Sequence, residues 1–500
     1  MREELENISK GFEVRKNLIA LRAEIKDPAQ KRALAYKLGG DFGVFTRLLE
    51  DADPKARKNA ALILGEMECD DLLPLLYKAY ESETQLFVRA EYLKAMAHCD
   101  YTGYVSRLKG CLKRNQETRW EESDIKHVRE ENAVLRSMIL SVEKPEKHRF
   151  TGYDNHFDVI LMTNRNFGAL TLAQAEEDGS CGKSGVHGGT VRLETDNIRK
   201  LFNIRTYTEM LFPIKGASRI MEKEPEAAAR ILARSGLLSF LEENHKGDGP
   251  FYFRVELKGK MPLEKKGNFI RKFAAALENY TDGSLCNYAS DYEIEIRLVE
   301  KQAGGFIPLL KLYTYQDRRF EYRQNALAAS ISPVNAAVMM QLAKPYMKED
   351  AQVLDPFCGV GTMLIERNIV KKANPLYGVD IYPEAVDKGR ENAGRAETVI
   401  NFINRDILSF KHEYLFDEIV SDLPAVTRTK DKGQILELYS AFLDKAKELL
   451  KEGAYLFLYT PESDVLERCL KERREYEIQE SWIFNEREGS IFYIIRYHEE

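Results

Sequence analysis

The sequence predicts three successive folds: an all-α part at the N-terminus, a mixed α/β part in the middle, and an α/β part of Rossmann-like type at the C-terminus. Three observations support this division. Residues 1–143 carry small and apolar side chains at helical spacing, and residues 148–325 contain alternating, strand-like runs with helices between them. In residues 326–500, strand-like and helical runs alternate, and an early strand leads through a glycine turn into a helix.

Length, charge and cysteine content narrow the class of protein. With 500 residues, 44% of them hydrophobic, the chain can bury more than one core. A formal net charge of −6 is not typical of a protein that binds nucleic acid over its whole surface, so any such contact must come from local basic patches. The seven cysteines include no Cys-x-x-Cys pair, which argues against a zinc site or a disulfide framework.

Nothing in the sequence predicts a membrane segment. No apolar run approaches the ~20 residues that a spanning helix needs, and residues 1–6 are charged rather than apolar. Scattered cysteines are typical of reduced thiols. We therefore expect a cytoplasmic protein with no membrane partner and no metal.

The N-terminal part contains a weak internal repeat. Asp-Pro pairs at residues 27–28 and 53–54 each precede a helical run, and a third related run covers residues 88–97. Aspartate caps the free amides of a helix start, and proline is tolerated in the first turn. The pattern resembles HEAT-like helical repeats, which implies a binding surface for a protein partner. A plain irregular helical bundle is the alternative, because the spacing is uneven.

The middle part combines strands and helices. Residues 157–162, 251–257 and 292–298 have the apolar or alternating pattern of strands. Residues 179–189 are rich in glycine and serine and predict a loop, whereas residues 268–278 predict a helix. The sequence therefore predicts a mixed α/β domain directly before the C-terminal part.

A cluster of basic residues lies in this middle part and predicts a surface that contacts RNA phosphates. Arginine and lysine supply the sequence-independent share of affinity for RNA. A solvated turn and helix face is the alternative interpretation. The predicted RNA-contacting residues are Lys258, Lys265, Lys266, Arg271 and Lys272.

The most informative segment is the run DPFCGVGT at residues 355–362, which lies between a short strand and an apolar helix. The first glycine gives the turn its backbone freedom, and the second lets a ligand approach the main chain. The run resembles motif I of class I S-adenosylmethionine (SAM) methyltransferases, in the version found in THUMP-containing RNA methyltransferases. An ordinary turn without a ligand is the alternative. The residues expected to bind SAM are Asp355, Phe357, Gly359, Gly361 and Thr362.

Three further segments extend this resemblance. Residues 203–208 resemble the Leu-Arg-Thr-Ala element between the family's ferredoxin-like linker and its THUMP fold, and residues 251–298 resemble the THUMP core. Residues 317–323 resemble the Arg-Gly-Tyr-Arg segment that precedes the family's catalytic domain. The resemblance therefore implies a ferredoxin-like linker and a THUMP-like domain that binds structured RNA by shape.

Two acidic residues follow the next strands of the C-terminal part. Asp380 lies about twenty residues after the glycines, where a carboxylate accepts hydrogen bonds from ribose hydroxyls in this kind of fold. A cap for the following helix is the alternative role for Asp380. The resemblance implies that Ile381 flanks the adenine and that Asp406 and Ile407 contact its other edge, with Asp406 accepting from the amino group.

The run after the fourth strand of the C-terminal part concerns the methyl acceptor. In the resembled family, an Asp or Asn, a Pro or Leu, a Pro and an aromatic residue orient an exocyclic base amine and stack on the base. Asp422, Leu423 and Pro424 match this pattern as catalytic residues, but Ala425 replaces the aromatic residue. Arg428 lies close by and could stack on a base or contact a phosphate.

The resemblance implies a SAM-dependent RNA methyltransferase that modifies an exocyclic base amine, with guanine N2 of tRNA or rRNA as the expected acceptor. Two alternatives remain open. Ala425 is compatible with a SAM- or RNA-binding scaffold that has lost catalysis, and the helical repeats are compatible with recruitment to a protein substrate.

Overall fold

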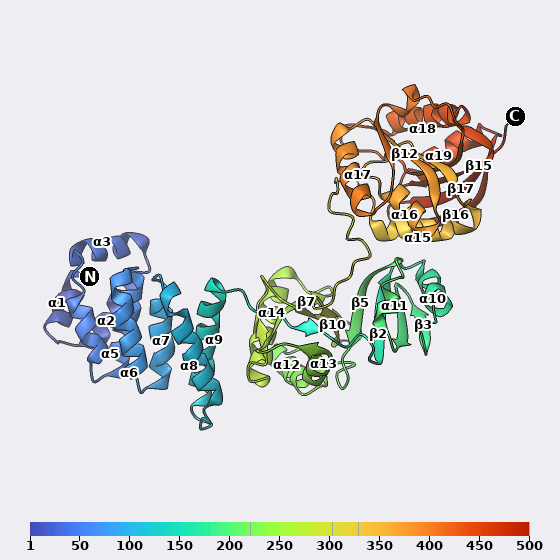
Figure 1. Cartoon of the computed structure of the whole chain (residues 1–500). Helices are drawn as coiled ribbons and strands as arrows, with labels where there is room; N and C mark the ends of the chain where they lie inside the picture. Colours follow the sequence, from blue (N-terminus) through green and yellow to red (C-terminus); the bar gives the residue numbers. More distant parts are fainter. Residues whose placement is uncertain (180, 221, 303, 329, 500) are drawn as a thin grey trace. The chain divides into compact units, whose positions relative to one another are not determined.

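The computed structural model describes residues 1–179, 181–220, 222–302, 304–328 and 330–499. The chain divides into two compact units, Met1–Glu146 and Lys147–Glu500 (Figure 1). The division into three separate domains, residues 1–143, 148–325 and 326–500, stays a prediction. No helix in the described part of the chain has the length and apolar character to cross a membrane.

The first unit is helical, as the sequence predicts. Aspartate caps open two of its helices: Asp27 accepts from the Ala29 amide at 2.9 Å, and Asp53 accepts from the Lys55 amide at 2.8 Å. The helices are α1 (Arg2–Ser9), α2 (Val14–Glu24), α3 (Pro28–Leu38), α4 (Gly43–Arg47), α5 (Pro54–Glu66), α6 (Leu73–Ser82), α7 (Leu86–Met96), α8 (Val105–Glu117) and α9 (Ile125–Val142).

These helices stack in successive layers (Figure 1). Helix α5 packs between α2 and α7, and α7 packs in turn against α9. The contact between α5 and α7 is close, because a Cβ added at Gly65 would lie only 2.6 Å from the Ala95 Cα. Each layer buries its apolar side against the next, which is the packing of a helical-repeat solenoid.

The middle part of the chain forms one mixed sheet in the order β3-β4-β2-β5-β10-β9-β7-β8. Alternate residues of its central strands face a single apolar core, against which α14 packs over β7 and β8. The strands are β2 (Phe157–Thr163), β3 (Ser184–His187), β4 (Thr190–Thr195), β5 (Tyr207–Pro213), β7 (Phe251–Lys258), β8 (Leu285–Asn287), β9 (Ile294–Glu300) and β10 (Phe306–Leu312). A short ladder pairs β1 (Arg149–Phe150) with β6 (His245–Lys246). The helices are α10 (Gly168–Glu177), α11 (Ile198–Leu201), α12 (Pro225–Ala233), α13 (Leu237–Asn244) and α14 (Leu263–Tyr280).

One sequence prediction in this part is wrong. The glycine-rich segment 179–189, expected to be a loop, contains strand β3, which pairs with β4 in an antiparallel hairpin. Gly188 supplies the turn with a positive φ of 58°. Pairing across a tight glycine turn therefore overrides the low strand propensity of these residues.

The C-terminal part is a doubly wound sheet in the order β13-β12-β11-β14-β15-β17-β16. Strands β11 to β15 run parallel to their neighbours, whereas β17 is antiparallel to both β15 and β16. The strands are β11 (Ala351–Asp355), β12 (Ala373–Asp380), β13 (Asn401–Asn404), β14 (Phe416–Asp422), β15 (Leu450–Thr460), β16 (Tyr476–Asn485) and β17 (Ser490–Tyr497). The helices are α15 (Pro333–Ala343), α16 (Thr362–Val370), α17 (Pro383–Arg395), α18 (Lys432–Lys447) and α19 (Ser463–Lys471).

Helices cover both faces of this sheet (Figure 1). Helices α18 and α19 share one apolar cluster with the sheet, and α15, α16 and α17 share the other. The strand order reverses between β11 and β14, because the chain runs outward from β11 to β13 and then returns to the other side. In open α/β sheets, ligands bind at such a switch point, beyond the carboxyl ends of the strands.

A buried ion pair joins helix α16 of the C-terminal part to a segment that comes before this part in the chain. Arg205 donates from Nε and Nη2 to the Glu366 carboxylate at 2.8 and 2.7 Å, and the Tyr322 hydroxyl donates to the same carboxylate at 2.7 Å. Glu366 lies on α16 and is fully buried. Two segments recognised in the sequence, residues 203–208 and 317–323, thus meet at the helix that follows the glycine turn.

The first prediction concerns this ion pair. Glu366→Gln leaves the Arg205 guanidinium without its charged partner in a buried site, so the free energy of unfolding should fall by ~3–5 kcal/mol. The measurement is urea unfolding of the full chain. Arg192→Gln is the control, because it breaks the exposed pair with Asp158 and should cost at most ~1 kcal/mol. Equal effects of the two changes would contradict a structural role for the buried pair.

Candidate cofactor and acceptor site

Three carboxylates meet at the switch point of the C-terminal sheet. Asp355 ends β11, Asp380 ends β12 and Asp422 ends β14, which are neighbouring parallel strands. They lie close enough that Asp380 and Asp422 both act electrostatically on Asp355. The three residues come from separate motifs, and the sheet brings them together as the sequence predicts.

The two glycines of the turn have different surroundings. Gly359 has a positive φ of 51°, and a Cβ at this position would meet no heavy atom within 4 Å. Gly361 has a φ of 79°, and its Cβ would lie 2.8 Å from the Phe402 ring. The open space therefore lies beside the first glycine, while close packing explains the second. The sequence analysis had assigned the close approach of a ligand to the second glycine, Gly361, whereas the open space lies at Gly359.

Asp380 is held in a fixed position by the backbone. Its Oδ2 accepts from the Gly359 amide and its Oδ1 accepts from the Tyr382 amide, both at 2.9 Å. Helix α17 has Tyr382 as its N-cap and no side-chain cap, so Asp380 is not the cap of that helix. Each carboxylate oxygen keeps a lone pair for a further donor. Ile381 is 49% exposed next to it, as a contact for a flat apolar ring requires.

The remaining residues predicted to bind the cofactor have varied surroundings. The exposed Asp406 accepts from the Leu408 amide at 2.9 Å through one oxygen and leaves the other oxygen for a ligand. Ile407 and Thr362 are buried, so their side chains belong to the core. Phe357 is half-buried and packs edge-on against Phe442, with ring centroids 5.4 Å apart.

Asp355 is almost completely buried beneath the turn. It accepts hydrogen bonds from the Ser421 hydroxyl at 2.7 Å and from the Phe357 amide at 3.1 Å. Burial raises the pKa of Asp355 to about 8, and these hydrogen bonds offset only part of that effect. Sequence reasoning missed Ser421, because a serine inside a strand carries no signal of this contact.

Asp422 is half-buried at the end of β14. Burial raises the pKa of its carboxyl to about 7. The next two residues are fixed from the neighbouring elements: the Leu423 amide donates to the Tyr459 carbonyl at 2.9 Å, and the Tyr439 hydroxyl donates to the Pro424 carbonyl at 2.7 Å. The loop that follows β14 therefore begins from a rigid point.

An aromatic ring lies beside Asp422, although not at position 425. Tyr459 of β15 is the register partner of Asp422, so both side chains point to the same face of the sheet. Tyr459 is half-buried, and burial raises the pKa of its hydroxyl, with a smaller contribution from the Asp422 charge. Ala425 is half-buried and Arg428 is exposed in the loop beyond. Sequence reasoning missed Tyr459, because its position next to Asp422 depends on the pairing of β14 with β15.

The basic residues predicted to contact RNA do not form one patch. Lys265, Lys266, Arg271 and Lys272 all lie on α14, and their side chains are exposed or half-exposed. Lys258 instead ends β7 and pairs with Glu256 at 2.9 Å. Helix α14 is therefore the part of the predicted basic surface that offers free positive charge.

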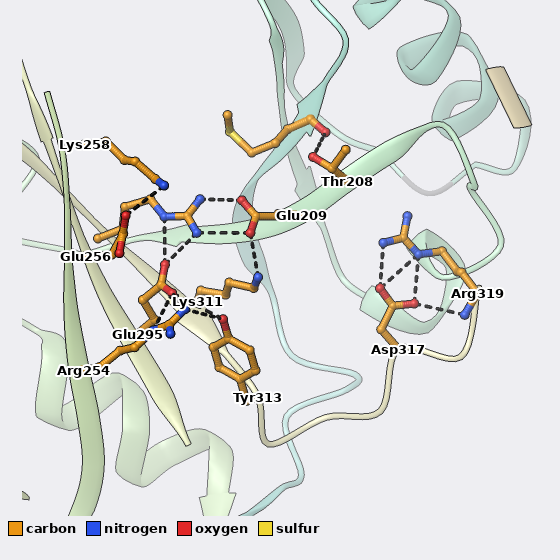
Figure 2. Close-up of polar contacts among 12 residues, drawn as sticks. Thr208, Glu209, Arg254, Glu256, Lys258, Glu295, Lys311, Tyr313, Asp317 and Arg319 are labelled. Atoms are coloured by element: carbon orange, nitrogen blue, oxygen red, sulfur yellow. Dashed lines mark hydrogen bonds and ion pairs between the residues drawn. The ribbon is translucent and has the colours of Figure 1, made fainter. Parts of the chain in front are cut away.

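Figure 2 shows why Lys258 differs from the others. Its pair with Glu256 lies beside a network of ion pairs on the sheet face opposite the apolar core, where Arg254 pairs with Glu295 at 2.6 Å and Lys311 pairs with Glu209 at 2.6 Å. The hydrogen bond from Arg297, together with Lys311, lowers the pKa of Glu209 to about 2. Arg254 and Lys311 are thus paired with carboxylates of other strands, whereas Lys258 is paired within its own strand.

The residues around the switch point fit SAM. SAM carries a sulfonium and an ammonium charge, which would favour the ionised form of the neighbouring carboxyls, and its ribose hydroxyls match the free lone pairs of Asp380. The open space beside Gly359 leaves room for the ligand at the turn. Among the described residues, His, Cys, Asp and Glu side chains nowhere gather in the groups of three that hold a metal ion.

The sheet order, the glycine turn and the carboxylates together define a class I methyltransferase fold. Comparison with known proteins agrees: residues 320–488 match the family described as an RMKL-like methyltransferase domain, and residues 43–122 match HEAT repeats. The match to HEAT repeats supports the helical-repeat interpretation of the N-terminal part over an irregular helical bundle.

Individual proteins resemble the chain over part of its length. The tRNA (guanine(10)-N2)-dimethyltransferase of Methanothermobacter thermautotrophicus is 33% identical over 146 residues, which are 29% of this chain and 42% of that protein. The chain therefore spans less than half the length of this relative. TrmN from Thermus thermophilus superimposes with a TM-score of 0.52 at 21% identity, over 68% of this chain and 99% of that one. SMU.472, a putative methyltransferase complexed with SAH, gives 0.52 at 15% identity, over 69% and 99%.

The second prediction follows from the raised pKa of Asp422. An unfolded aspartate titrates near ~4, so the folded state holds this proton more tightly, and stability is lost as the pH rises towards 7. Asp422→Asn carries no titrating group and should therefore lose less unfolding free energy between pH 5 and pH 8, by roughly 2 kcal/mol. The measurement is urea unfolding at both pH values.

Asp387→Asn is the control for this experiment, because Asp387 is an exposed carboxylate of α17 paired with Arg390. Its pH dependence should follow that of the unaltered chain. If the unfolding free energy of Asp422→Asn showed the same pH dependence as that of the unaltered chain, Asp422 would titrate as an ordinary exposed aspartate.

Proposed function

We propose that this protein is a SAM-dependent RNA methyltransferase that modifies an exocyclic base amine, with guanine N2 of tRNA or rRNA as the acceptor. The observation that carries the proposal is Asp422, a carboxylate with a raised pKa at the end of β14, next to a turn that fits SAM. The 33%-identical relative, named as a tRNA guanine-N2 dimethyltransferase, supports the choice of acceptor.

The cofactor half of the site acts by positioning. SAM supplies an electrophilic methyl group when bound. The Asp380 carboxylate binds the ribose, Ile381 and Asp406 contact the adenine, and the Gly359 side of the turn accommodates the ligand. The buried Asp355, below the turn, holds its proton near neutral pH, and a cationic ligand beside it would favour the ionised form.

The acceptor half of the site acts on one nitrogen. The Asp422 carboxylate accepts a hydrogen bond from the base amine, which turns the nitrogen lone pair towards the methyl group. A nitrogen that gains a methyl group must release a proton, and a carboxylate with a pKa near 7 is suited to accept it at neutral pH. The rigid Leu423-Pro424 backbone keeps this geometry fixed.

Tyr459 fills the role that the sequence pattern assigned to position 425. Its ring lies on the same face as Asp422, one strand away, and it packs edge-on against Phe484 at 5.6 Å. An extruded base needs an aromatic surface on which to stack. Tyr459 therefore compensates for Ala425, and Arg428 lies free in the loop to contact phosphate.

The other parts of the chain take supporting roles in this proposal. The middle domain is THUMP-like and holds RNA through the cations of α14. All seven cysteines are free thiols, which is consistent with a cytoplasmic protein. A scaffold without catalysis is the second candidate, and Ala425 is the observation that favours it.

The third prediction tests the cofactor. Asp380→Ala removes the acceptor of the ribose hydrogen bonds, each worth ~1.5–3 kcal/mol, so SAM affinity should fall roughly ten- to a hundredfold. Calorimetric titration with SAM measures this. Asp387→Ala removes a carboxylate from the exposed side of α17 and should leave the affinity unchanged. An undiminished affinity of Asp380→Ala would refute this cofactor site.

The fourth prediction tests the acceptor side. Asp422→Ala should abolish methyl transfer to RNA while SAM still binds, because this carboxylate acts on the acceptor nitrogen. Tyr459→Ala should raise KM for RNA and lower kcat, whereas Tyr459→Phe keeps the ring and should retain most of the activity.

The measurement is transfer of labelled methyl groups from SAM to RNA from cells lacking the protein, followed by mass spectrometry of the nucleosides. Methylguanosine is the expected product. An unaltered protein that binds SAM and modifies no RNA would favour the scaffold, and labelling of protein in the same extract would favour a protein methyltransferase.

A further inference from the structure

The helical unit contains a groove in which five of the nine lining residues are cations. It has a volume of about 490 Å³ and lies between α2, α5 and the start of α7. Arg15, Arg22 and Lys26 contribute from α2, and Lys55 and Lys58 contribute from α5. No carboxylate lines the groove. The chain as a whole has a net charge of −6, so this concentration of positive charge is local.

Three of these cations are available to a ligand. Arg15, Lys26 and Lys55 are exposed, and among the described residues none of them has an acidic side chain within ion-pair distance. By contrast, Lys58 pairs with Glu91 at 2.9 Å, and Arg22 contacts only the neutral Asn59 amide, at 3.5 Å. Exposed cations without partners keep their full charge for an incoming anion.

The floor of the groove is rigid. Asn59 is buried and donates to the Lys55 carbonyl at 2.7 Å, which holds its side chain against α5. Helix α5 itself is held between α2 and α7. The cations therefore project from two fixed helices, and little order has to be created when a ligand binds.

Three apolar side chains, those of Ile19, Ala23 and Phe87, lie among the cations. Ile19, on the same side of α2, is 49% exposed, and Phe87 lines the groove from α7. A neighbouring hollow shares Arg15 and Ile19 but contains Glu13, Asp51 and Asp53. The positively charged groove thus ends at acidic residues on one side, which gives a bound chain a defined direction.

We propose that this groove binds the phosphate backbone of the RNA on which the C-terminal domain acts. The proposal rests on the proposed function for the identity of that RNA. Arginine and lysine on two adjacent helices match a chain of phosphates, and Ile19 and Phe87 supply apolar contacts for sugar or base faces. The groove would be a second RNA-binding surface, separate from α14.

RNA is a better match for the groove than an acidic protein for one physical reason. Both surfaces belong to one chain, so an RNA held by α14 meets the groove as an intramolecular event at high effective concentration. The groove lies in a different unit from the Asp422 site, so it contributes to affinity for RNA. Losing it should therefore raise KM for RNA and leave kcat unchanged.

The test compares two triple variants of the full chain. The groove variant combines Arg15→Gln, Lys26→Gln and Lys55→Gln. The control combines Lys37→Gln, Lys78→Gln and Lys113→Gln, which are exposed cations of α3, α6 and α8 outside the groove. Both variants change the net charge by the same amount. The probe is bulk tRNA from cells that lack the protein, titrated over a range of salt concentrations.

The groove variant should bind this tRNA roughly tenfold more weakly than the control, and its log–log salt slope should fall by about 2, since each lost contact removes ~0.7–0.9. SAM affinity and the melting temperature should match those of the control. Equal losses in both variants would mean that only net charge matters, which overturns the proposal. So would unchanged tRNA binding with lost binding of polyglutamate, because the groove would then bind acidic protein.

This test is independent of catalysis. A chain that binds tRNA through the groove with the expected salt slope, but methylates no RNA, contradicts the proposed function and supports the groove. A chain that methylates RNA with the same KM in both variants contradicts the groove and leaves the proposed function intact.

Discussion

The geometry of the candidate site depends on one ring, that of Phe402, which packs against three glycines. A Cβ would lie 2.8 Å from this ring at Gly361, 3.2 Å at Gly378 and 2.6 Å at Gly389. The turn after β11, strand β12 and helix α17 can therefore approach each other only because these side chains are absent. That approach brings the Asp380 carboxylate within 2.9 Å of the Gly359 amide, which fixes the ribose-binding group relative to the turn.

Two kinds of electrostatic environment coexist in the second unit. On the sheet face of the middle part, carboxylates lie among guanidinium and ammonium groups, so the pKa of Glu209 falls to about 2. At the switch point, no cation of the described residues offsets the burial of Asp355 and Asp422, and burial raises their pKa values instead. The first environment stabilises the fold through internal pairing. The second leaves carboxyls that hold their protons near neutral pH and that a cationic ligand would shift towards the ionised form.

The sequence predicted those features that depend on local order, and it missed those that depend on pairing across the fold. The glycine turn, Asp380 and the β14 exit could be recognised because strand, turn and helix follow one another within a few residues. Tyr459 could not, because its place beside Asp422 depends on strand register. Strand β3 was hidden in a glycine-rich segment for the same reason. The basic groove likewise needs α2 and α5 to pack, although its cations are visible individually in the sequence.

Two adjacent residues of α16, Glu366 and Arg367, form ion pairs with different parts of the chain. Glu366 receives Arg205 and Tyr322, whereas the fully buried Arg367 pairs with Glu418 of β14 at 2.6 Å. The helix that begins at the glycine turn is thereby tied both to its own sheet and to the segment before it. In evolution, and in the laboratory, this limits where the chain can be recombined. A chimaera that joins this C-terminal domain to the front half of a relative should fold well only if Arg205 and Tyr322 are transferred together with Glu366.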